Sequence, residues 1–110
     1  MNVRFTGRHV GIPDADRAWV EKKVEGLARY HRRLQDVEVR VALDGAGTES
    51  VELEADLGKR RVVARSRAAG FRPAFDDAVE ALKHQLLRDK EKGMESRRRG
   101  RRAAAGGSPA

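Results

Sequence analysis

Lysine and arginine are the functional side chains that stand out most in this sequence. Its 110 residues include 24 Lys and Arg but only 17 Asp and Glu, for a formal net charge of +7. The charges are segregated, since residues 35–57 hold seven acids and one base, whereas residues 58–71 hold five bases and no acid. Guanidinium and ammonium groups bind phosphate, so this pattern favours a polyanionic partner. Nucleic acid is the first candidate and an anionic membrane is the second.

Catalytic and metal-binding patterns are weak by comparison. His9, His31 and His84 are far apart, and no two of them have the spacing of metal ligands. Asp76 and Asp77 are adjacent, so on a helix they point about 100° apart, and the helix dipole explains them better than a carboxylate pair does. The sequence has no cysteine, no phosphate-binding glycine loop and no nucleophile elbow. We therefore expect no enzymatic activity, no cofactor, no metal and no small-molecule substrate.

Alternating apolar and polar residues in the middle of the chain predict the sheet that must position the basic side chains. Residues 36–68 are typical of three consecutive antiparallel strands, each with one face toward a core. Gly58-Lys59 fits a two-residue hairpin turn, and counting back from it pairs Glu52 with Arg65. In this register the apolar residues share one face, and acids meet arginines on the other. Cross-strand neutralisation therefore explains the arginines of the last strand better than RNA binding does; they are Arg61, Arg65 and Arg67.

The N-terminal part predicts a strand and a helix. Residues 3–6 alternate as a short first strand, which a loop follows. Pro13 fits the first turn of a helix that runs to about His31 and buries one apolar stripe. Trp19 and Tyr30 lie near this stripe and are interpreted as core-edge residues, not as base-stacking platforms. A strand–helix–strand connection is right-handed by default, which places the first strand parallel to the next one.

The C-terminal part predicts a second helix and a tail. Gly70 interrupts the chain, Pro73 opens the helix, and Gly93 fits a C-cap. From residue 94 the composition shifts to Arg, Ala, Gly and Ser, which predicts a disordered basic tail over residues 94–110. Residues 1–93 then form one domain of the α+β class. It is a β-α-β-β-β-α two-layer sandwich, with a four-stranded mixed sheet and two helices on one face.

Two stretches carry a family resemblance when they are taken together with chain length and element order. They are Gly7-Arg8-His9-Val10 with Ile12 and a helix ending in Tyr30, and the second half from Phe71 through Leu82, Gln85 and Leu86 into a basic tail. Residues 1–93 thereby resemble the ribosome hibernation promoting factor family, especially its short members and the ribosome-associated translation inhibitors. The resemblance implies a stress or stationary-phase factor that binds ribosomal RNA in the tRNA and mRNA channel of the small subunit. Such a factor inhibits translation by occupancy.

Some residues depart from the pattern of that family. Asp16 stands where the family usually has an apolar residue. Gly70, Arg72 and Pro73 replace its usual acidic, aromatic and small residues at the start of the second helix. The basic tail also differs from the acidic tail of the inhibitor type.

Two helices on one sheet face present their solvent sides together, so we expect their bases to form a continuous phosphate-binding surface. The residues expected to contact RNA are Arg8, His9, Lys22, Lys23, Arg29, Arg32, Arg33, Lys83, Arg88, Lys90 and Lys92. For each of them the alternative is a solvated side chain, paired with a nearby acid. The bases of the tail belong either to an RNA-binding arm or to a solubilising segment; they are Arg97, Arg98, Arg99, Arg101 and Arg102.

Two other classes of function stay open. A general double-stranded RNA-binding module would use the helix pair to read shape and would bind free duplex RNA. A protein-interaction module would use the acidic block of residues 49–56 to hold a basic partner. The sequence also lacks a run of apolar residues of membrane length and a signal-peptide core. We therefore expect a cytoplasmic protein, monomeric away from the ribosome, with the small subunit and its RNA as partners and no membrane.

Overall fold

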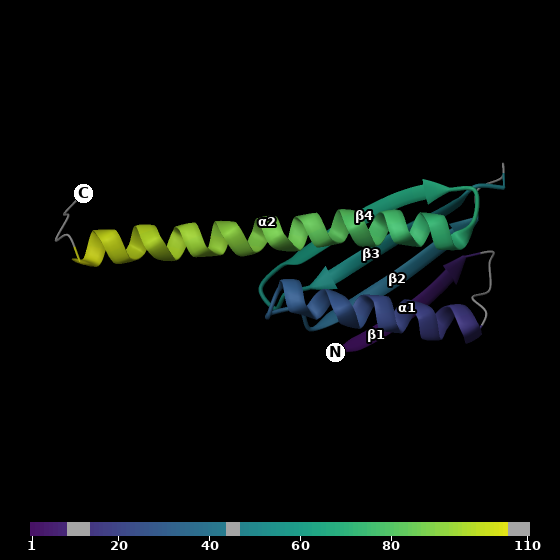
Figure 1. The fold of residues 1–110 in the computed structure, drawn as a ribbon, viewed down its shortest axis with the longest axis horizontal. Coiled ribbons are helices and arrows are strands. Elements are labelled where there is room, and N and C mark those ends of the chain that lie inside the picture. The colour runs from purple at the N-terminus through teal and green to yellow at the C-terminus, as the bar shows by residue number, and fades with distance from the viewer. Residues whose placement is uncertain (9–13, 44–46, 106–110) are drawn as a thin grey trace.

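Four strands form one mixed sheet in the computed structural model of this chain, in the order β1-β2-β3-β4 (Figure 1). They are β1 (Asn2–Arg8), β2 (Asp36–Leu43), β3 (Glu49–Asp56) and β4 (Arg61–Ala68). β1 pairs with β2 in parallel and the other pairs are antiparallel, so the predicted mixed sheet is confirmed. The structure describes the backbone of residues 1–8, 14–43 and 47–105, and the side chains of residues 1–7, 14–43 and 47–92.

The turn between β3 and β4 sets the register of this part of the sheet, as the sequence predicts. Gly58 has a φ of +91°, a conformation that glycine adopts without steric cost. The N–H of Leu57 donates to the carbonyl of Arg60 at 2.9 Å and closes the turn. Glu52 lies opposite Arg65, as counting back from the turn predicts. A slip of one residue would move every apolar side chain to the other face, so a single register is preferred.

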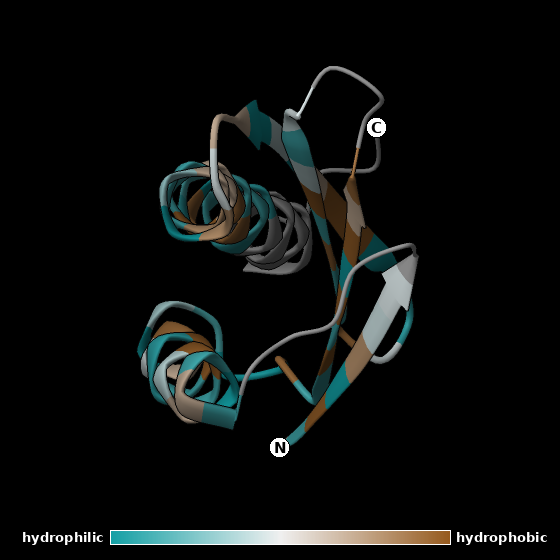
Figure 2. Cartoon of the chain, turned by 90° about the vertical axis from the view of Figure 1, so that its right-hand side faces the viewer, coloured by the Kyte–Doolittle hydropathy of each residue, from teal (hydrophilic) through white to brown (hydrophobic). Residues whose placement is uncertain are grey.

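Two helices and a short 3₁₀ segment cover one face of this sheet (Figure 2). α1 spans Asp14–Gly26, the 3₁₀ segment η1 spans Leu27–Tyr30, and α2 spans Phe71–Ala105. Both helices begin at the same end of the sheet, and α2 extends past the sheet at the other end (Figure 1). The predicted two-layer α+β arrangement, with both helices on one face, is confirmed.

The hydrophobic core lies between the helices and the inner face of the sheet. Val39 and Leu53 are fully buried on neighbouring strands, and Val20 of α1 and Phe75 of α2 belong to the same buried cluster. Burial of apolar surface stabilises a fold by roughly 25 cal/mol for each Å² removed from water. Burial of this face therefore determines where the two helices lie.

Two predicted boundaries near the N-terminus are wrong. β1 includes Gly7 and Arg8, which the sequence predicts as loop, because these residues continue the pairing with β2. The remainder of that predicted loop, residues 9–11, lies outside the described residues. α1 gives way to the 3₁₀ segment after Gly26, whereas the sequence predicts one helix to about His31. Glycine is a poor helix former, and Gly26 is where the α-helical hydrogen bonding ends.

Both predicted ends of α2 also differ from the structure. The helix begins at Phe71, so Pro73 is its third residue and still lies in the first turn, where the N–H groups have no helical partner. The helix then continues through Gly93, where the sequence predicts a C-cap. Glycine inside a helix costs about 1 kcal/mol relative to alanine, and neighbouring strong helix formers can offset that cost. The division of the chain into a domain of residues 1–93 and a tail of residues 94–110 stays a prediction.

Arg40 is the centre of a charge network on the outer face of the sheet. Its guanidinium nitrogens lie 2.6 Å from a carboxylate oxygen of Glu54 and 3.1 Å from one of Glu38. A third contact joins Arg40 to Glu52 at 3.4 Å. The hydrogen bond with Glu54 raises the pKa of Arg40 above its ordinary value and lowers the pKa of the Glu54 carboxyl.

The arginines of β4 join the same network. Arg61 reaches Glu54 at 3.2 Å, and Arg65 reaches Glu52 at 3.0 Å. Cross-strand neutralisation, which the sequence predicts for this face, is therefore confirmed for these two arginines. Acids of the same sheet balance the positive charges of these arginines, so the arginines are weaker candidates for binding an external anion.

Replacing Glu54 by Gln is predicted to make the stability of the protein less dependent on pH. The pKa of Glu54 lies below its ordinary value of 4.5 in the folded protein. Its charge therefore stabilises the fold above that pH, and this contribution is lost as the pH falls through the folded-state pKa. E54Q should be less stable than the native protein near neutral pH, and the gap should close in acid. Urea unfolding at a series of pH values measures the gap.

A matched control is Glu25→Gln on α1. Glu25 is exposed and takes part in none of the ion pairs within the described residues. Its replacement should leave the free energy of unfolding within about 0.5 kcal/mol of the native value. A gap for E54Q that stays constant from neutral to acidic pH would contradict the role assigned to this carboxylate.

Candidate nucleic-acid interface

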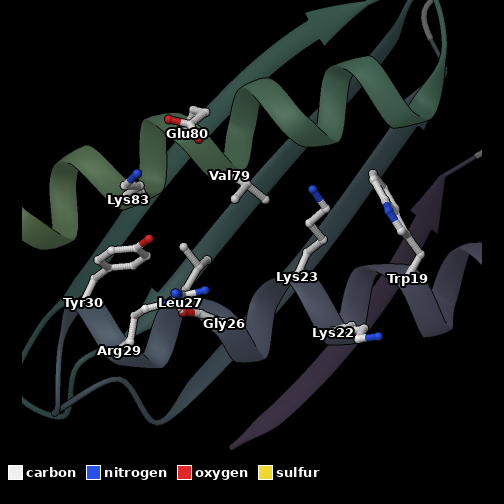
Figure 3. A pocket seen from close by; sticks show the side chains of 10 residues that line it. All are labelled: Trp19, Lys22, Lys23, Gly26, Leu27, Arg29, Tyr30, Val79, Glu80 and Lys83. Atoms are coloured by element: carbon white, nitrogen blue, oxygen red, sulfur yellow. Dashed lines mark hydrogen bonds between the residues drawn. The ribbon is translucent and has the colours of Figure 1, made fainter.

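A groove lies between the two helices, with α1 and η1 on one side and α2 on the other (Figure 3). It has a volume of about 270 Å³, and four of its lining side chains are basic, whereas one is acidic. The residues that line it are Trp19, Lys22, Lys23, Gly26, Leu27, Arg29, Tyr30, Val79, Glu80 and Lys83. The groove is therefore cationic, with an apolar floor and an aromatic side chain near each end (Figure 3).

Trp19 anchors the end of the groove where both helices begin. Its ring packs against Phe75 and Phe71 of α2, with centroids 5.2 and 6.5 Å apart. The guanidinium of Arg72 lies 4.8 Å from the Trp19 ring and 3.0 Å from the carboxylate of Asp16. Two residues that depart from the family pattern, Asp16 and Arg72, thus form an ion pair that joins the starts of the two helices.

Lys23 is already engaged at the same end of the groove. Its ammonium lies 5.4 Å from the centre of the Trp19 ring and 3.5 Å from a carboxylate oxygen of Asp76. Both side chains of this ion pair are about half exposed, so water screens it and it is weak. A phosphate can therefore compete with Asp76 for the ammonium of Lys23.

Tyr30 forms the other end of the groove, and two cations lie against its ring. The guanidinium of Arg29 is 5.4 Å from the ring centre, and the ammonium of Lys83 is 5.1 Å from it. Arg29 is held there because its Nε donates to the carbonyl of Gly26 at 3.0 Å, at the end of α1. The 3₁₀ segment thus positions both the ring and one of its cations.

The structure brings some of the predicted RNA-binding residues together and separates others. The groove gathers Lys22, Lys23, Arg29 and Lys83, from two helices. Arg88 and Lys92 instead line a separate hollow, together with Arg60 and Gln85. The exposed predicted bases that line neither of these are Arg32, Arg33 and Lys90. The side chains of Arg8, His9, Arg97, Arg98, Arg99, Arg101 and Arg102 lie outside the described residues.

Sequence reasoning did not assign the aromatic residues of the groove to the site. Trp19 and Tyr30 do pack against the core, which confirms their interpretation as core-edge residues. They are nevertheless partly exposed and line the groove as well. The spacing of Trp19 and Lys23 could have indicated their role, since residues four apart are neighbours on a helix surface. This spacing places a ring beside a cation.

His31 has a structural role. Its side chain is 8% exposed, and its Nε2 lies 2.7 Å from a carboxylate oxygen of Asp89. The backbone N–H of Arg33 donates to Nδ1 at 3.2 Å, so Nε2 carries the hydrogen that Asp89 accepts. The other oxygen of Asp89 lies 2.8 Å from Arg60. These contacts join the end of η1 to α2 and to the turn between β3 and β4.

The fold and the groove define a class of protein. Across the described part of the chain, no group of three or more His, Cys, Asp or Glu is placed to hold a metal ion. No helix in that part is long and apolar enough to cross a membrane. The described residues instead form a cationic groove on a small α+β domain, with an aromatic ring near each end. Such a groove suits an anionic ligand.

Comparison with known proteins identifies the family. Residues 3–94 match the family described as sigma 54 modulation protein / S30EA ribosomal protein. The chain belongs to this family, which confirms the resemblance found in the sequence. A ribosome hibernation promoting factor from Azotobacter vinelandii is 30% identical over 104 residues, covering 94% of this chain and 95% of that protein.

A second relative is longer than this chain. A ribosome hibernation promotion factor from Deinococcus radiodurans is 26% identical over 102 residues, covering 89% of this chain and 53% of that protein. The matched region of this chain thus corresponds to about half of the Deinococcus protein.

Solved structures share the fold. The N-terminal domain of Protein Y from Thermus thermophilus aligns with a TM-score of 0.71 and 33% identity, over 80% of this chain and 98% of that one. A ribosomal subunit interface protein from Coxiella burnetii aligns with a TM-score of 0.73 and 21% identity, over 83% of this chain and 99% of that one. The second likeness shows the fold alone.

Replacing Asp89 by Ala is predicted to destabilise the fold by about 1–3 kcal/mol, because it leaves the buried Nε2–H of His31 without an acceptor. Arg60 loses its partner in the same change. Denaturant unfolding measures the difference. Glu91→Ala, at an exposed position of the same helix, is the control and should change stability by less than about 0.5 kcal/mol. Equal stability of both variants would mean that the contacts of Asp89 do not stabilise the fold.

Proposed function

We propose that this chain acts as a ribosome hibernation factor. In this proposal it binds the small ribosomal subunit in the cytoplasm and inhibits translation under stress or in stationary phase. It does so by occupying the channel for tRNA and mRNA, on ribosomal RNA, without chemistry of its own. The relatives named ribosome hibernation promoting or promotion factor support this reading.

The convergence of bases in the groove is the observation that carries the proposal. Four basic side chains from two helices line it, with Glu80 as the single acid among the lining residues. Each phosphate that they neutralise would release counterions, so binding should weaken steeply as salt is added. The groove thus fits an RNA backbone as its ligand.

The charge balance elsewhere in the protein supports the same surface. Arg61 and Arg65 are paired with acids on the outer face of the sheet, so that face has fewer unbalanced charges to offer. The same pairs engage Glu52 and Glu54 of the acidic block, which weakens the alternative of a module that holds a basic protein partner. A general double-stranded RNA-binding module remains the second candidate, and the experiment below separates the two.

The other predicted bases would extend the contact beyond the groove. Arg32 and Arg33 follow η1 and are exposed, and Arg88, Lys90 and Lys92 are exposed along α2. We propose that these residues, with Arg8 and His9, contact phosphates and add affinity without reading sequence. The basic run of residues 97–102 would act in the same way.

Charge reversal in the groove is predicted to weaken binding to the small subunit. Lys22 is exposed and outside the ion pairs within the described residues, and Lys83 lines the same groove from the other helix. Lys22→Glu/Lys83→Glu should reduce affinity at least tenfold, on the order of 1.4 kcal/mol or more. The slope of log affinity against log salt should fall by about 2, because two phosphate contacts are lost. Co-sedimentation with purified subunits at several salt concentrations measures both.

Arg4→Glu/Lys59→Glu is the matched control, because it makes the same change in net charge at exposed positions outside the groove. The control should bind small subunits nearly as well as the native protein and should still inhibit a translation extract. Unchanged binding of the groove variant would remove this face from the proposal. Equal binding of the native protein to free duplex RNA and to small subunits would favour the general double-stranded RNA-binding module.

A further inference from the structure

We infer that the Tyr30 end of the groove binds one unpaired base of an RNA strand, stacked on the Tyr30 ring. This inference rests on the proposed function only in taking RNA as the ligand. It adds a recognition element that contact with phosphates alone would not supply. The part of the groove concerned, here called the Tyr30 pocket, is formed by Leu27, Arg29, Tyr30, Val79, Glu80 and Lys83.

The Tyr30 ring packs against the core but is not enclosed by it. Tyr30 is partly exposed, and Lys83 from α2 and Arg29 from η1 lie within 5.4 Å of its centre (Figure 3). Contacts between a cation and a ring at an exposed site are weak, and Lys83 has a long, flexible side chain. A base can therefore replace one of these cations on the ring, and the displaced cation can move to the phosphate.

Trp19, at the other end of the groove, is less suited to this role. Its ring is engaged with Phe71 and Phe75 in an aromatic cluster within the domain. Tyr30 has no aromatic partner among the described residues. Tyr30 is therefore the ring of the groove that remains open to stacking by a ligand.

The shape and charge of the groove fit a base with its phosphate. Leu27 is 2% exposed and Val79 is partly exposed, so they give the pocket an apolar floor. The whole groove measures about 270 Å³, close to the lower end of the range of small-ligand pockets, which begins at about 300 Å³. Lys22 and Lys23 continue along the groove, where the neighbouring phosphates would lie (Figure 3). A ring beside a row of cations is the combination that binds single-stranded nucleic acid.

The pairing state of the RNA is what the pocket would recognise. In a duplex each base is stacked and paired within the helix, so a side-chain ring cannot reach its face. A bulged or splayed-out base offers that face at little cost. The pocket would thus favour irregular, folded RNA over regular duplex, and the phosphate contacts alone would not.

A hairpin RNA with one bulged adenosine tests the inference directly. Its partners are the same hairpin with an abasic residue at the bulge, and a fully paired hairpin. The native protein should bind the bulged RNA about tenfold more tightly than the abasic RNA, as judged by fluorescence anisotropy. This ratio corresponds to about 1.4 kcal/mol, within the range measured for stacking of a base on an aromatic side chain.

Two variants separate stacking from a structural role of Tyr30. Tyr30→Phe keeps the ring and should keep the tenfold preference. Tyr30→Leu keeps an apolar side chain without the ring, and should bind both RNAs with affinities within about twofold, a difference too small for stacking. A purely structural role would weaken both RNAs alike and leave the preference intact, which would overturn the inference.

A measurement on the native protein keeps the test independent of variant folding. A 2-aminopurine placed at the bulge should lose fluorescence when the protein binds, because stacking on Tyr30 quenches it. Unchanged fluorescence at saturation, or equal affinity for the bulged and abasic RNAs, would overturn the inference.

The failure of this inference can be told from the failure of the proposed function. Small-subunit binding that depends on Lys22 and Lys83, without preference for the bulged base, would leave the proposed function standing and refute the Tyr30 pocket. Preference for the bulged base without binding to small subunits would support the pocket and refute the proposed function.

Discussion

The arrangement of the whole domain follows from the need to cover the apolar face of the sheet. Val39 and Leu53 are fully buried at the centre of that face, and hydrophobic burial is the dominant favourable term in folding. Strands are about 4.8 Å apart, whereas a helix with its side chains is about 10–12 Å wide, so one helix cannot cover four strands. Two helices side by side can, and they leave a groove between their solvent-facing flanks. The candidate site is thus a consequence of how the core is closed.

Charge is distributed over the two sides of the sheet in different ways. On the outer face, Arg40 lies among three carboxylates and the arginines of β4 balance two of them. On the helical side the groove has four basic side chains and one acid. An excess of positive charge therefore lines the groove, whereas the arginines of this network on the outer face are paired with acids. The ion pair of Asp16 with Arg72 and the hydrogen bond of His31 with Asp89 join the helical segments on either side of the groove, so its walls keep their spacing.

Helix α2 shows that exposed basic residues of one helix need not belong to the same surface. The sequence predicts one continuous basic face from residues of both helices. In the structure Lys83 points into the groove, whereas Arg88 and Lys92 line a hollow with Arg60, near the turn between β3 and β4. Helical periodicity identifies the buried stripe of α2. The residues on either side of this stripe contact different parts of the fold. Only the packed fold assigns each base to a flank.

The sequence by itself determined the features that depend on residues close together along the chain. Period-2 alternation and the turn at Gly58 specify the strands and their register, because a slip would expose the apolar face. The layer order and the parallel first strand follow from short connections and their handedness. Weak local preferences were less informative, and the helix passes through Gly93 because one glycine costs little among strong helix formers.

The tertiary structure alone decided the contacts that join distant residues. His31 and Asp89 are 58 residues apart, and Asp16 and Arg72 are 56 apart. The cations on Tyr30 come from η1 and from α2, which meet only when both helices pack on the sheet. No local sequence pattern predicts these long-range contacts, because they depend on how both helices pack on the shared core. For this reason the sequence predicts a polyanionic partner, whereas the gathering of a ring and its cations in one groove is seen only in the structure.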